Sequence, residues 1–384
     1  MMLRVRAVAA VGLAQGLLAT AAAGAPSKAT NVVIILADDF GYGEPAYNGG
    51  PAHTPHLDAM SRGEHSIQFS RFYCGGAVCS PTRASHLTGR SPNRVCMWDW
   101  INLETAMHLP HNEFTIADAA AMTGHHRSMH VGKWHLGHLA HQPADPREGP
   151  KGANFTLTTP AHVGFDEYYT TAPQAEISTT FNCGCLPGDP NGSQCIWGHW
   201  REGKDHGISK PHCDRMYLKN GSSADDVGFD PTPMVKGGYG ADNAALLVDK
   251  FASFLNTTVA AKQNFLGAIW FQNVHVEYTA TQTFTSMYPI EPENMSFHGV
   301  PDQMHQDYYG CVTAMDAQVG RMRQLLVTLG VSENTLLFFT ADNGPEVRTP
   351  GHTEGLAGRK RSLTEGGIRM PTRTVTPPCV QAVR

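Results

Sequence analysis

Two short segments of the sequence place carboxylate and amide side chains in a pattern suited to metal binding. Asp38 and Asp39 directly follow the apolar, β-branched run 31–37, and Asp342 and Asn343 follow a second such run. Runs of this kind are typical of buried parallel strands, and ligands of open α/β sheets bind outside the carboxyl ends of their strands. Three carboxylates and an amide oxygen are hard ligands, suited to Ca²⁺ or Mg²⁺ and not to zinc. Either pair taken alone is more simply explained as an acidic turn or a helix cap.

A third segment carries a resemblance to a known family. Residues 79–90 read Cys-Ser-Pro-Thr-Arg-Ala-Ser-His-Leu-Thr-Gly-Arg, and the sequence resembles the sulfatase family of the alkaline-phosphatase superfamily, whose modification signature is Cys-x-Pro-x-Arg. That motif alone is weak evidence, but further matches follow the family order at 37–43 (ADDFGYG), 131–137 (VGKWHLG), 164–167 (GFDE), 340–344 (TADNG) and 365–371 (EGGIRMP). The resemblance covers residues 30 to 371. It is nearest to the arylsulfatase B and N-acetylgalactosamine sulfatase branch, through 271–275 and 134–138.

The resemblance implies a fold and a reaction. The expected fold is α/β, with a large, mostly parallel central sheet flanked by helices, as in alkaline phosphatase. The expected activity is hydrolysis of the sulfate ester of a carbohydrate or aryl alcohol. Cys79 would be oxidised to Cα-formylglycine by the formylglycine-generating enzyme. One hydroxyl of the hydrated aldehyde would attack sulfur, and the second would then be deprotonated and expel sulfate.

The resemblance also assigns the metal site. One calcium ion would be held near the modified Cys79 by Asp38, Asp39, Asp342 and Asn343. The ion would lower the pKa of the nucleophile and polarise a sulfate oxygen. Arg83 lies four residues beyond Cys79, one helical turn if the segment is helical. By the resemblance, its guanidinium would hold the diol and offset the acidic cluster.

Four further residues are expected to act on the substrate. Lys133 would bind sulfate oxygens, and His135 would orient the diol and help to deprotonate its second hydroxyl. His275 resembles the family histidine that protonates the leaving oxygen, and Lys360 matches a second sulfate-binding lysine. The alternatives are a solvated surface lysine at 133, an ordinary loop histidine at 135 and a structural histidine at 275. At position 360 the two neighbouring arginines allow a register shift of one residue.

Alternating strand and helix patterns must position these residues. Strands are expected at 31–37, 129–131, 265–271 and 335–340, and helices at 114–122, 242–255 and 307–329, with a further helix starting at Pro55 behind a Thr54 cap. Residues 170–233, rich in Gly, Pro and Cys, predict a loop insertion. The catalytic domain is expected at 26–371. The tail 372–384 does not resemble the family, so the small C-terminal domain usual in sulfatases is expected to be absent.

The N-terminus predicts the secretory pathway. Residues 1–25 show two arginines, an apolar run and small residues, as in a signal peptide; the alternative, a membrane anchor, would need a longer apolar run. Five Asn-x-Ser/Thr sequons, at Asn154, Asn191, Asn220, Asn256 and Asn294, agree with a secreted or lysosomal glycoprotein. The nine cysteines leave eight after modification of Cys79. Disulfides are favoured over a zinc site for those between 183 and 213.

The balance of charged residues excludes some classes of function. The chain has 29 basic and 34 acidic residues, a formal charge of −5, and removal of the signal peptide would leave 27 basic residues against 34 acidic ones. This balance argues against nucleic-acid binding and against a polybasic membrane surface, and no stable membrane insertion is expected. A phosphonate or phosphate monoester hydrolase of the same fold is an alternative function, and a truncated, inactive secreted glycoprotein is another. The sequence does not define the oligomeric state.

Overall fold

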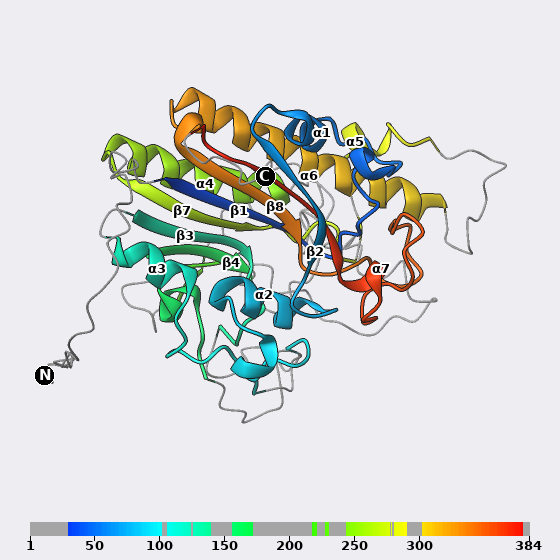
Figure 1. The fold of residues 1–384 in the computed structure, drawn as a ribbon. Helices are drawn as coiled ribbons and strands as arrows, with labels where there is room; N and C mark the ends of the chain where they lie inside the picture. The colour runs from blue at the N-terminus through cyan, green and yellow to red at the C-terminus, as the bar shows by residue number, and fades with distance from the viewer. Residues whose placement is uncertain are drawn as a thin grey trace, which may run out of the picture.

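The computed structural model describes residues 30–101, 106–123, 126–139, 156–171, 217–220, 227–229, 243–276, 278, 280–289 and 302–378. Within these ranges one sheet of nine strands forms, in the order β2-β9-β8-β1-β7-β3-β4-β5-β6 (Figure 1). The strands are β1 (Asn31–Ala37), β2 (Ser66–Tyr73), β3 (His126–Lys133), β4 (Glu167–Thr171), β5 (Tyr217–Asn220), β6 (Val227–Phe229), β7 (Asn264–Trp270), β8 (Thr335–Ala341) and β9 (Arg369–Val375). The α-helices are α1 (Pro55–Arg62), α2 (Cys79–Thr88), α3 (Ile116–Met122), α4 (Asn243–Ala260), α5 (Gln282–Thr285), α6 (Asp302–Thr328) and α7 (Glu365–Ile368).

The centre of the sheet is parallel. Strands β8, β1, β7, β3 and β4 pair in parallel with their neighbours, whereas β2 and β9 at one side and β5 and β6 at the other pair antiparallel. The expected α/β class with a mostly parallel central sheet is therefore confirmed. Because parallel strands place all their carboxyl ends at one edge, the segments that follow β1, β3, β7 and β8 meet there.

Helices cover both faces of this sheet. Helices α1, α4 and α6 lie over one face, and α2 and α3 lie over the other (Figure 1). In β1 the side chains alternate between the two cores: Val33 and Ile35 pack with α4 and α6, while Leu36 packs in the core that contains Ala84 and Leu87 of α2. Each such side chain contributes about 1.5–3 kcal/mol when buried. Burial on both faces explains why this strand reads as an unbroken apolar run.

Several element boundaries differ from expectation. Helix α3 begins at Ile116 and not at 114, because Thr115 and Asp118 form a capping box that starts the helix there. Strand β3 extends from His126 to Lys133, well beyond the expected 129–131, since its main chain pairs with β7 along its whole length up to Gly132. Thr54 precedes α1 as expected but does not cap it. Its hydroxyl instead accepts a hydrogen bond from the Ala46 N–H at 2.9 Å.

Two regions without an expected strand contribute to the sheet. Strands β5 and β6 lie within 170–233, the range predicted to be a loop insertion. Strand β9 continues past residue 371 to Val375 between β2 and β8. The sequence of β9 is polar, so it lacks the apolar pattern that would predict a strand. Its Arg373 is buried against the ring of Tyr47, 3.9 Å from the ring centroid, which replaces the usual apolar contact.

Some expectations on processing fall outside the described residues. The signal segment 1–25, three of the sequons and the cysteines from 183 to 213 lie there, as does Cys379. Among the described cysteines, Cys74, Cys79 and Cys96 are free thiols. Asn256 is exposed as a glycan acceptor must be, but it lies on α4 and not in a loop. Across the described ranges no helix is both long and apolar enough to span a bilayer.

Candidate active site

The carboxyl ends of β1, β7 and β8 bring the predicted acidic residues together. Backbone hydrogen bonds hold these ends in register: the Asp38 N–H donates to the Asn273 carbonyl at 2.8 Å, and the Asp342 N–H donates to the Ala37 carbonyl at 3.1 Å. The Asp39 N–H donates to Asp342 Oδ1 at 3.1 Å, and Asp39 adopts a left-handed φ of 53° that turns the chain sharply after β1. Segments about 300 residues apart in sequence thus share one buried site.

The acidic side chains form a cluster with the geometry of a cation site. One ligand atom from each of Asp38, Asp39, Cys79 and Asp342 lies within 4.8 Å of the others, and all four residues are buried. Asn343 adjoins them, because its amide nitrogen donates to Asp39 Oδ1 at 2.6 Å. The Asn343 Oδ1 is buried and accepts no hydrogen bond from any described residue. Carboxylate oxygens and a buried amide oxygen that accepts no hydrogen bond from a described residue are suitable ligands for Ca²⁺ or Mg²⁺.

Arg83 contacts this cluster and is fully buried. Its Nη2 is 2.7 Å from Asp342 Oδ2 and 3.4 Å from Asp38 Oδ2, and its Nη1 donates to the Lys133 carbonyl at 2.9 Å. The guanidinium also stacks over the ring of Trp270 at 5.3 Å. Arg83 is one turn after Cys79 on α2, so the helix directs both side chains into the same site. Arg83 therefore forms ion pairs with two of the three acidic residues.

Two lysines reach the same carboxylates from other elements. Lys133 at the end of β3 places Nζ 2.7 Å from Asp38 Oδ2 and 3.6 Å from Cys79 Sγ. Lys360 places Nζ 2.9 Å from Asp39 Oδ2. Neither lysine is a solvated surface charge, since their side chains are 1% and 5% exposed. Arg361, next to Lys360, points away to Glu346 and is 54% exposed.

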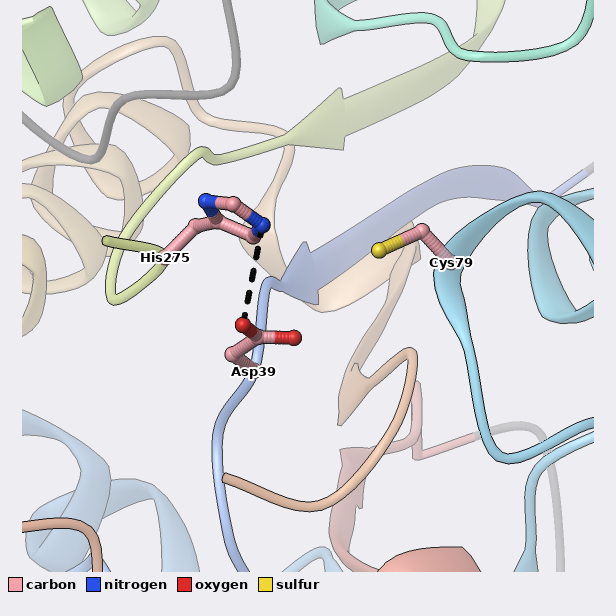
Figure 2. A group of neighbouring side chains, drawn as sticks. All are labelled: Asp39, Cys79 and His275. Atoms are coloured by element: carbon pink, nitrogen blue, oxygen red, sulfur yellow. Dashed lines mark ion pairs between the residues drawn. The ribbon is translucent and has the colours of Figure 1, made fainter. Parts of the chain in front are cut away.

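Cys79 is the first residue of α2, and its side chain points toward Asp39 and His275 (Figure 2). Its Sγ is 3.6 Å from Asp38 Oδ1. Burial raises the pKa of the thiol well above its ordinary value, although Lys133 and Lys360 oppose this effect. The unmodified side chain is consequently a neutral thiol at physiological pH and a weak nucleophile. The start of the helix supplies partial positive charge at this position, which favours an anion there.

His275 follows β7 and faces Asp39 across the site (Figure 2). Its Nε2 is 3.7 Å from Asp39 Oδ2, and its Nδ1 lies 2.6 Å from the Val276 carbonyl. A carbonyl can only accept, so Nδ1 carries a proton, and Nε2 is the nitrogen directed at the site. Burial lowers the pKa of His275, and Lys360 and Lys133 lower it further. Asp39, Cys79 and His275 also group closely enough to share one cation.

His135 is buried two residues beyond Lys133, with a left-handed φ of 56°. Its Nε2 donates to the Ile101 carbonyl at 2.7 Å, and the Ile101 N–H donates to the Ser80 hydroxyl at 3.1 Å. Ser80 is the neighbour of Cys79 on α2. The described contacts therefore connect His135 to Ile101 and Ser80, next to Cys79, a connection that the sequence did not suggest.

Three carboxyl groups face three cations in the site. The carboxyl groups belong to Asp38, Asp39 and Asp342, and the cations to Arg83, Lys133 and Lys360, as the contacts above show. Burial would raise the pKa of Asp38, but Lys133 and Arg83 hold it well below the ordinary value. Burial and the charge of Asp38 together raise the pKa of Asp342 to about 7, against the pull of Arg83. A bound cation would favour the ionised form of Asp342.

Two residues that the sequence did not single out belong to the surroundings of the site. Glu346 Oε2 is 3.7 Å from Lys360 Nζ, and Oε1 is 2.8 Å from Arg361 Nη1, so one carboxylate anchors the segment that carries Lys360. Trp270 forms the face on which Arg83 stacks. Glu346 follows the Asp342–Gly344 motif closely and was open to detection, whereas Trp270 reads as an ordinary core residue.

Fold and site together define an α/β protein that gathers a cysteine, a buried cluster of carboxyl groups with the geometry of a cation site and two lysines at the carboxyl edge of its sheet. Residues 30–373 match the family model described as Sulfatase, and the chain belongs to the sulfatase family. Its relatives include arylsulfatase A of Homo sapiens, 29% identical over 94% of this chain and 62% of that protein. N-acetylgalactosamine-6-sulfatase of Mus musculus is 27% identical over 91% of this chain and 58% of that protein.

A solved structure supports the fold independently. The crystal structure of Ps i-CgsB in complex with k-i-k-neocarrahexaose has a TM-score of 0.65 to this chain at 23% identity, covering 92% of this chain and 67% of the other. The curated relatives are longer. This chain spans 62% of the length of human arylsulfatase A and 58% of that of the mouse N-acetylgalactosamine-6-sulfatase.

Proposed function

We propose that the chain hydrolyses sulfate esters, using a formylglycine made from Cys79 and one bound calcium ion. The observation that carries the proposal is the position of Cys79. The cysteine of the modification signature lies within 4.8 Å of three buried carboxylates and is 3.6 Å from the ammonium group of Lys133. A buried thiol of raised pKa is inert. An aldehyde at this position, once hydrated, supplies two hydroxyls, one to form a bond to sulfur and one to expel sulfate.

Calcium fits the donor set, with Asp38, Asp39, Asp342 and Asn343 as ligands beside the modified Cys79. When bound, it supplies a Lewis acid that favours a deprotonated hydroxyl and draws electrons from a sulfate oxygen. The ion would also take over part of the neutralisation of Asp38 and Asp39, which Lys133 and Lys360 now provide. The net positive charge then gained by the site suits an anionic ester.

The protein side chains have separate tasks in this proposal. Lys133 and Lys360 bind the sulfate oxygens, and Arg83 fixes the acidic cluster and holds the diol. His135, held by Ile101, orients the diol and accepts the proton of its second hydroxyl. His275 donates a proton from Nε2 to the leaving oxygen. The pKa of His275 is lowered by burial and by both lysines, and an anionic substrate between them would raise it toward the range that a general acid needs.

Biosynthesis forms part of the same proposal. The formylglycine-generating enzyme is the expected partner for Cys79, and a secretory route to the lysosome or cell exterior is the expected localisation. The N-terminal pattern and the sequons support this route, as does the exposure of Asn256 on α4. Sulfate ester is the proposed substrate class; the alcohol is proposed to be a sugar or a phenol.

A panel of matched aryl esters tests the reaction. The chain, co-expressed with the modifying enzyme, should release nitrophenol from the sulfate ester with a kcat/KM far above that for the phosphate or phosphonate ester. A preference for the phosphonate or phosphate ester would replace the proposal with the alternative of the same fold. Binding of sulfated glycans with no turnover of any ester would favour an inactive glycoprotein.

Peptide mass spectrometry tests the modification directly. Cys79 should appear as formylglycine, while Cys74, a free thiol five residues earlier without the Pro and Arg context, should stay unmodified in the same sample. Cys79→Ala should remove activity while leaving the fold intact, because a buried alanine introduces no polar group. Active protein that carries only thiol at position 79 would refute the catalytic role of the modification.

A further inference from the structure

Hydrogen bonds among three buried residues connect α2 to His135. The hydroxyl of Ser80, the residue after Cys79 on α2, accepts from the Ile101 N–H at 3.1 Å. The Ile101 carbonyl in turn accepts from His135 Nε2 at 2.7 Å. Ser80 is 0% exposed, and Ile101 and His135 are each 1% exposed. Water does not compete for these groups, so loss of one of the bonds would leave a buried polar group unsatisfied.

The bond to Ile101 decides which nitrogen of His135 is basic. A carbonyl oxygen accepts hydrogen bonds and cannot donate them, so Nε2 carries a proton. In the neutral imidazole the lone pair is then on Nδ1. Nδ1 is consequently the atom of His135 that can take the proton of a hydroxyl at position 79, the task that the proposed function gives to this residue.

Ile101 is itself held at a fixed position. Its side chain packs in the core that also contains residues of α2, and Met97, four residues earlier, packs in the same core. The Met97 N–H donates to the Pro92 carbonyl at 2.9 Å. Between these two anchors, the ring centroid of Trp100 lies 6.4 Å from that of His135. The Ile101 carbonyl therefore reaches His135 from an anchored segment.

The main chain of His135 is held by its neighbours in the sequence. Before it, Trp134 Nε1 donates to the Thr158 carbonyl at 2.7 Å. After it, the Leu136 carbonyl accepts from the Leu109 N–H at 2.9 Å. The left-handed φ of 56° at His135 is uncommon outside glycine and persists where the surrounding structure fixes it. Main-chain contacts do not by themselves fix the rotation of the ring, which the Nε2 hydrogen bond restricts.

The hydrogen bond of the Ser80 hydroxyl leads away from its own helix. Ser85, also on α2, donates instead to the Thr82 carbonyl within that helix, at 2.8 Å. The two serines thus differ in what their hydroxyls hold. Ser80 holds the loop that contacts His135, whereas Ser85 makes a local contact only, which makes Ser85 a matched control.

We propose that Ser80 is a positioning residue for the reaction: through Ile101 it holds the His135 ring with the proton on Nε2 and with Nδ1 as the basic atom. Nδ1 takes the proton of the second hydroxyl at position 79. The O–H electrons re-form the carbonyl there, sulfate leaves with the electron pair of its C–O bond, and the proton passes from Nδ1 to solvent. The inference rests on the proposed sulfatase function.

Spectroscopy tests the positioning without turnover. Proton–nitrogen correlation spectra of the Cys79→Ala chain distinguish the two tautomers of an imidazole ring, and the signals lost in His135→Gln are those of His135. This ring should be in the Nε2–H form. Ser80→Ala should lower the fraction in that form, because the Ile101 N–H loses its acceptor, whereas Ser80→Thr, which keeps the hydroxyl, should retain it. Ser85→Ala should leave the tautomer unchanged.

Kinetics of the modified chain gives a second readout. Ser80→Ala should lower kcat for nitrophenyl sulfate by about 10- to 100-fold, the usual loss when a partner that orients a site residue is removed, without raising KM. Nitrophenol is released before the second hydroxyl is deprotonated, so its release should show a burst and then a slow phase. Ser80 lies in the modification signature, so each rate is divided by the formylglycine content measured by mass spectrometry. Ser80→Thr should recover most of the rate.

The two readouts separate this inference from the proposed function. An unchanged His135 tautomer in folded Ser80→Ala would overturn the positioning role, as would a normal kcat per formylglycine without a burst. If Ser80→Ala does not fold, Ser80→Cys replaces it, because a thiol is a weaker acceptor, and smaller changes in the same direction are expected in both readouts. If the parent chain hydrolyses no sulfate ester, the proposed function fails, and the tautomer in the Cys79→Ala chain still decides whether Ser80 positions His135.

Discussion

Lys360 Nζ lies 2.9 Å from Asp39 Oδ2, and the side chain of the adjacent Arg361 points out to Glu346. The lysine is 5% exposed and the arginine 54%. The two residues are consecutive cations with the same formal charge, yet only the lysine reaches the acidic cluster. This contrast makes the pair a matched test of which position acts on the substrate.

Lys360→Ala should lower kcat/KM for a sulfate ester by about 10²- to 10³-fold, the usual loss when one donor to a developing negative charge is removed. Arg361→Ala should change it only a few-fold, because its ion pair is half-exposed and screened. Steady-state kinetics of the two variants measures these changes in kcat/KM, and circular dichroism confirms that both variants fold. Comparable losses at the two positions would mean that Lys360 has no special role in binding sulfate.

The metal site gives a second prediction. Asp342→Asn should weaken Ca²⁺ binding by about 100-fold or more, because a charged oxygen ligand is lost from a small set of donors. Sulfate-ester turnover should fall in parallel. Calorimetric titration of the variant with Ca²⁺ measures the first effect.

Asp316→Asn provides the control for that titration. Asp316 is also a largely buried carboxylate, but it accepts hydrogen bonds from the N–H groups of His56 and Leu57 at the start of α1, at 3.0 and 2.7 Å. Its variant should lose stability and keep Ca²⁺ affinity. Unchanged affinity in Asp342→Asn would remove Asp342 from the ligand set.

His275 is predicted to matter in proportion to the quality of the leaving group. A nitrophenol leaves readily as an anion, whereas a sugar hydroxyl requires a proton. His275→Ala should therefore slow a sugar sulfate by about 10²- to 10⁴-fold and an activated aryl sulfate much less. Lys133→Ala should affect both substrates similarly, since both present the same sulfate group. Equal losses on the two substrates for His275→Ala would show that another group donates the proton.

Glu44 predicts a pH dependence of stability that is independent of catalysis. It is fully buried, and burial raises its pKa from 4.5 to about 8 despite a hydrogen bond from Tyr308 and another from the His352 N–H. The folded state thus holds a proton that the unfolded chain has lost between these pH values. Its contribution to the free energy of unfolding is complete below about pH 4.5. As the pH rises from there through 8, this contribution is lost by about 1.4 kcal/mol per pH unit.

Glu44→Gln isolates this contribution, because an amide mimics the protonated acid and can accept the same two hydrogen bonds. Urea unfolding between pH 5 and 8 should give a stability difference between parent and variant that changes steadily across the range. A constant difference would mean that Glu44 is ionised in the folded protein.

Much of the site could be predicted from the sequence, because its residues sit in local motifs. The strand β1 and the turn Asp38–Asp39 behind it are local: an apolar, β-branched run predicts a buried strand, and the two acidic residues follow directly at its carboxyl end. The same holds for β8 with Asp342, and for the turn of α2 that separates Cys79 from Arg83. In each case the information lies within a few consecutive residues, and main-chain geometry does the rest.

Tertiary structure decided what depends on partners distant in the chain. Strand β9 forms because its main chain pairs with β2 and β8. Its polar Arg373 is buried against Tyr47, a partner that the local sequence of β9 does not predict. The choice of Lys360 over Arg361 depends on which side chain faces Asp39, more than 300 residues away. Burial and charge balance are properties of the packed molecule, and they set the energy of these contacts.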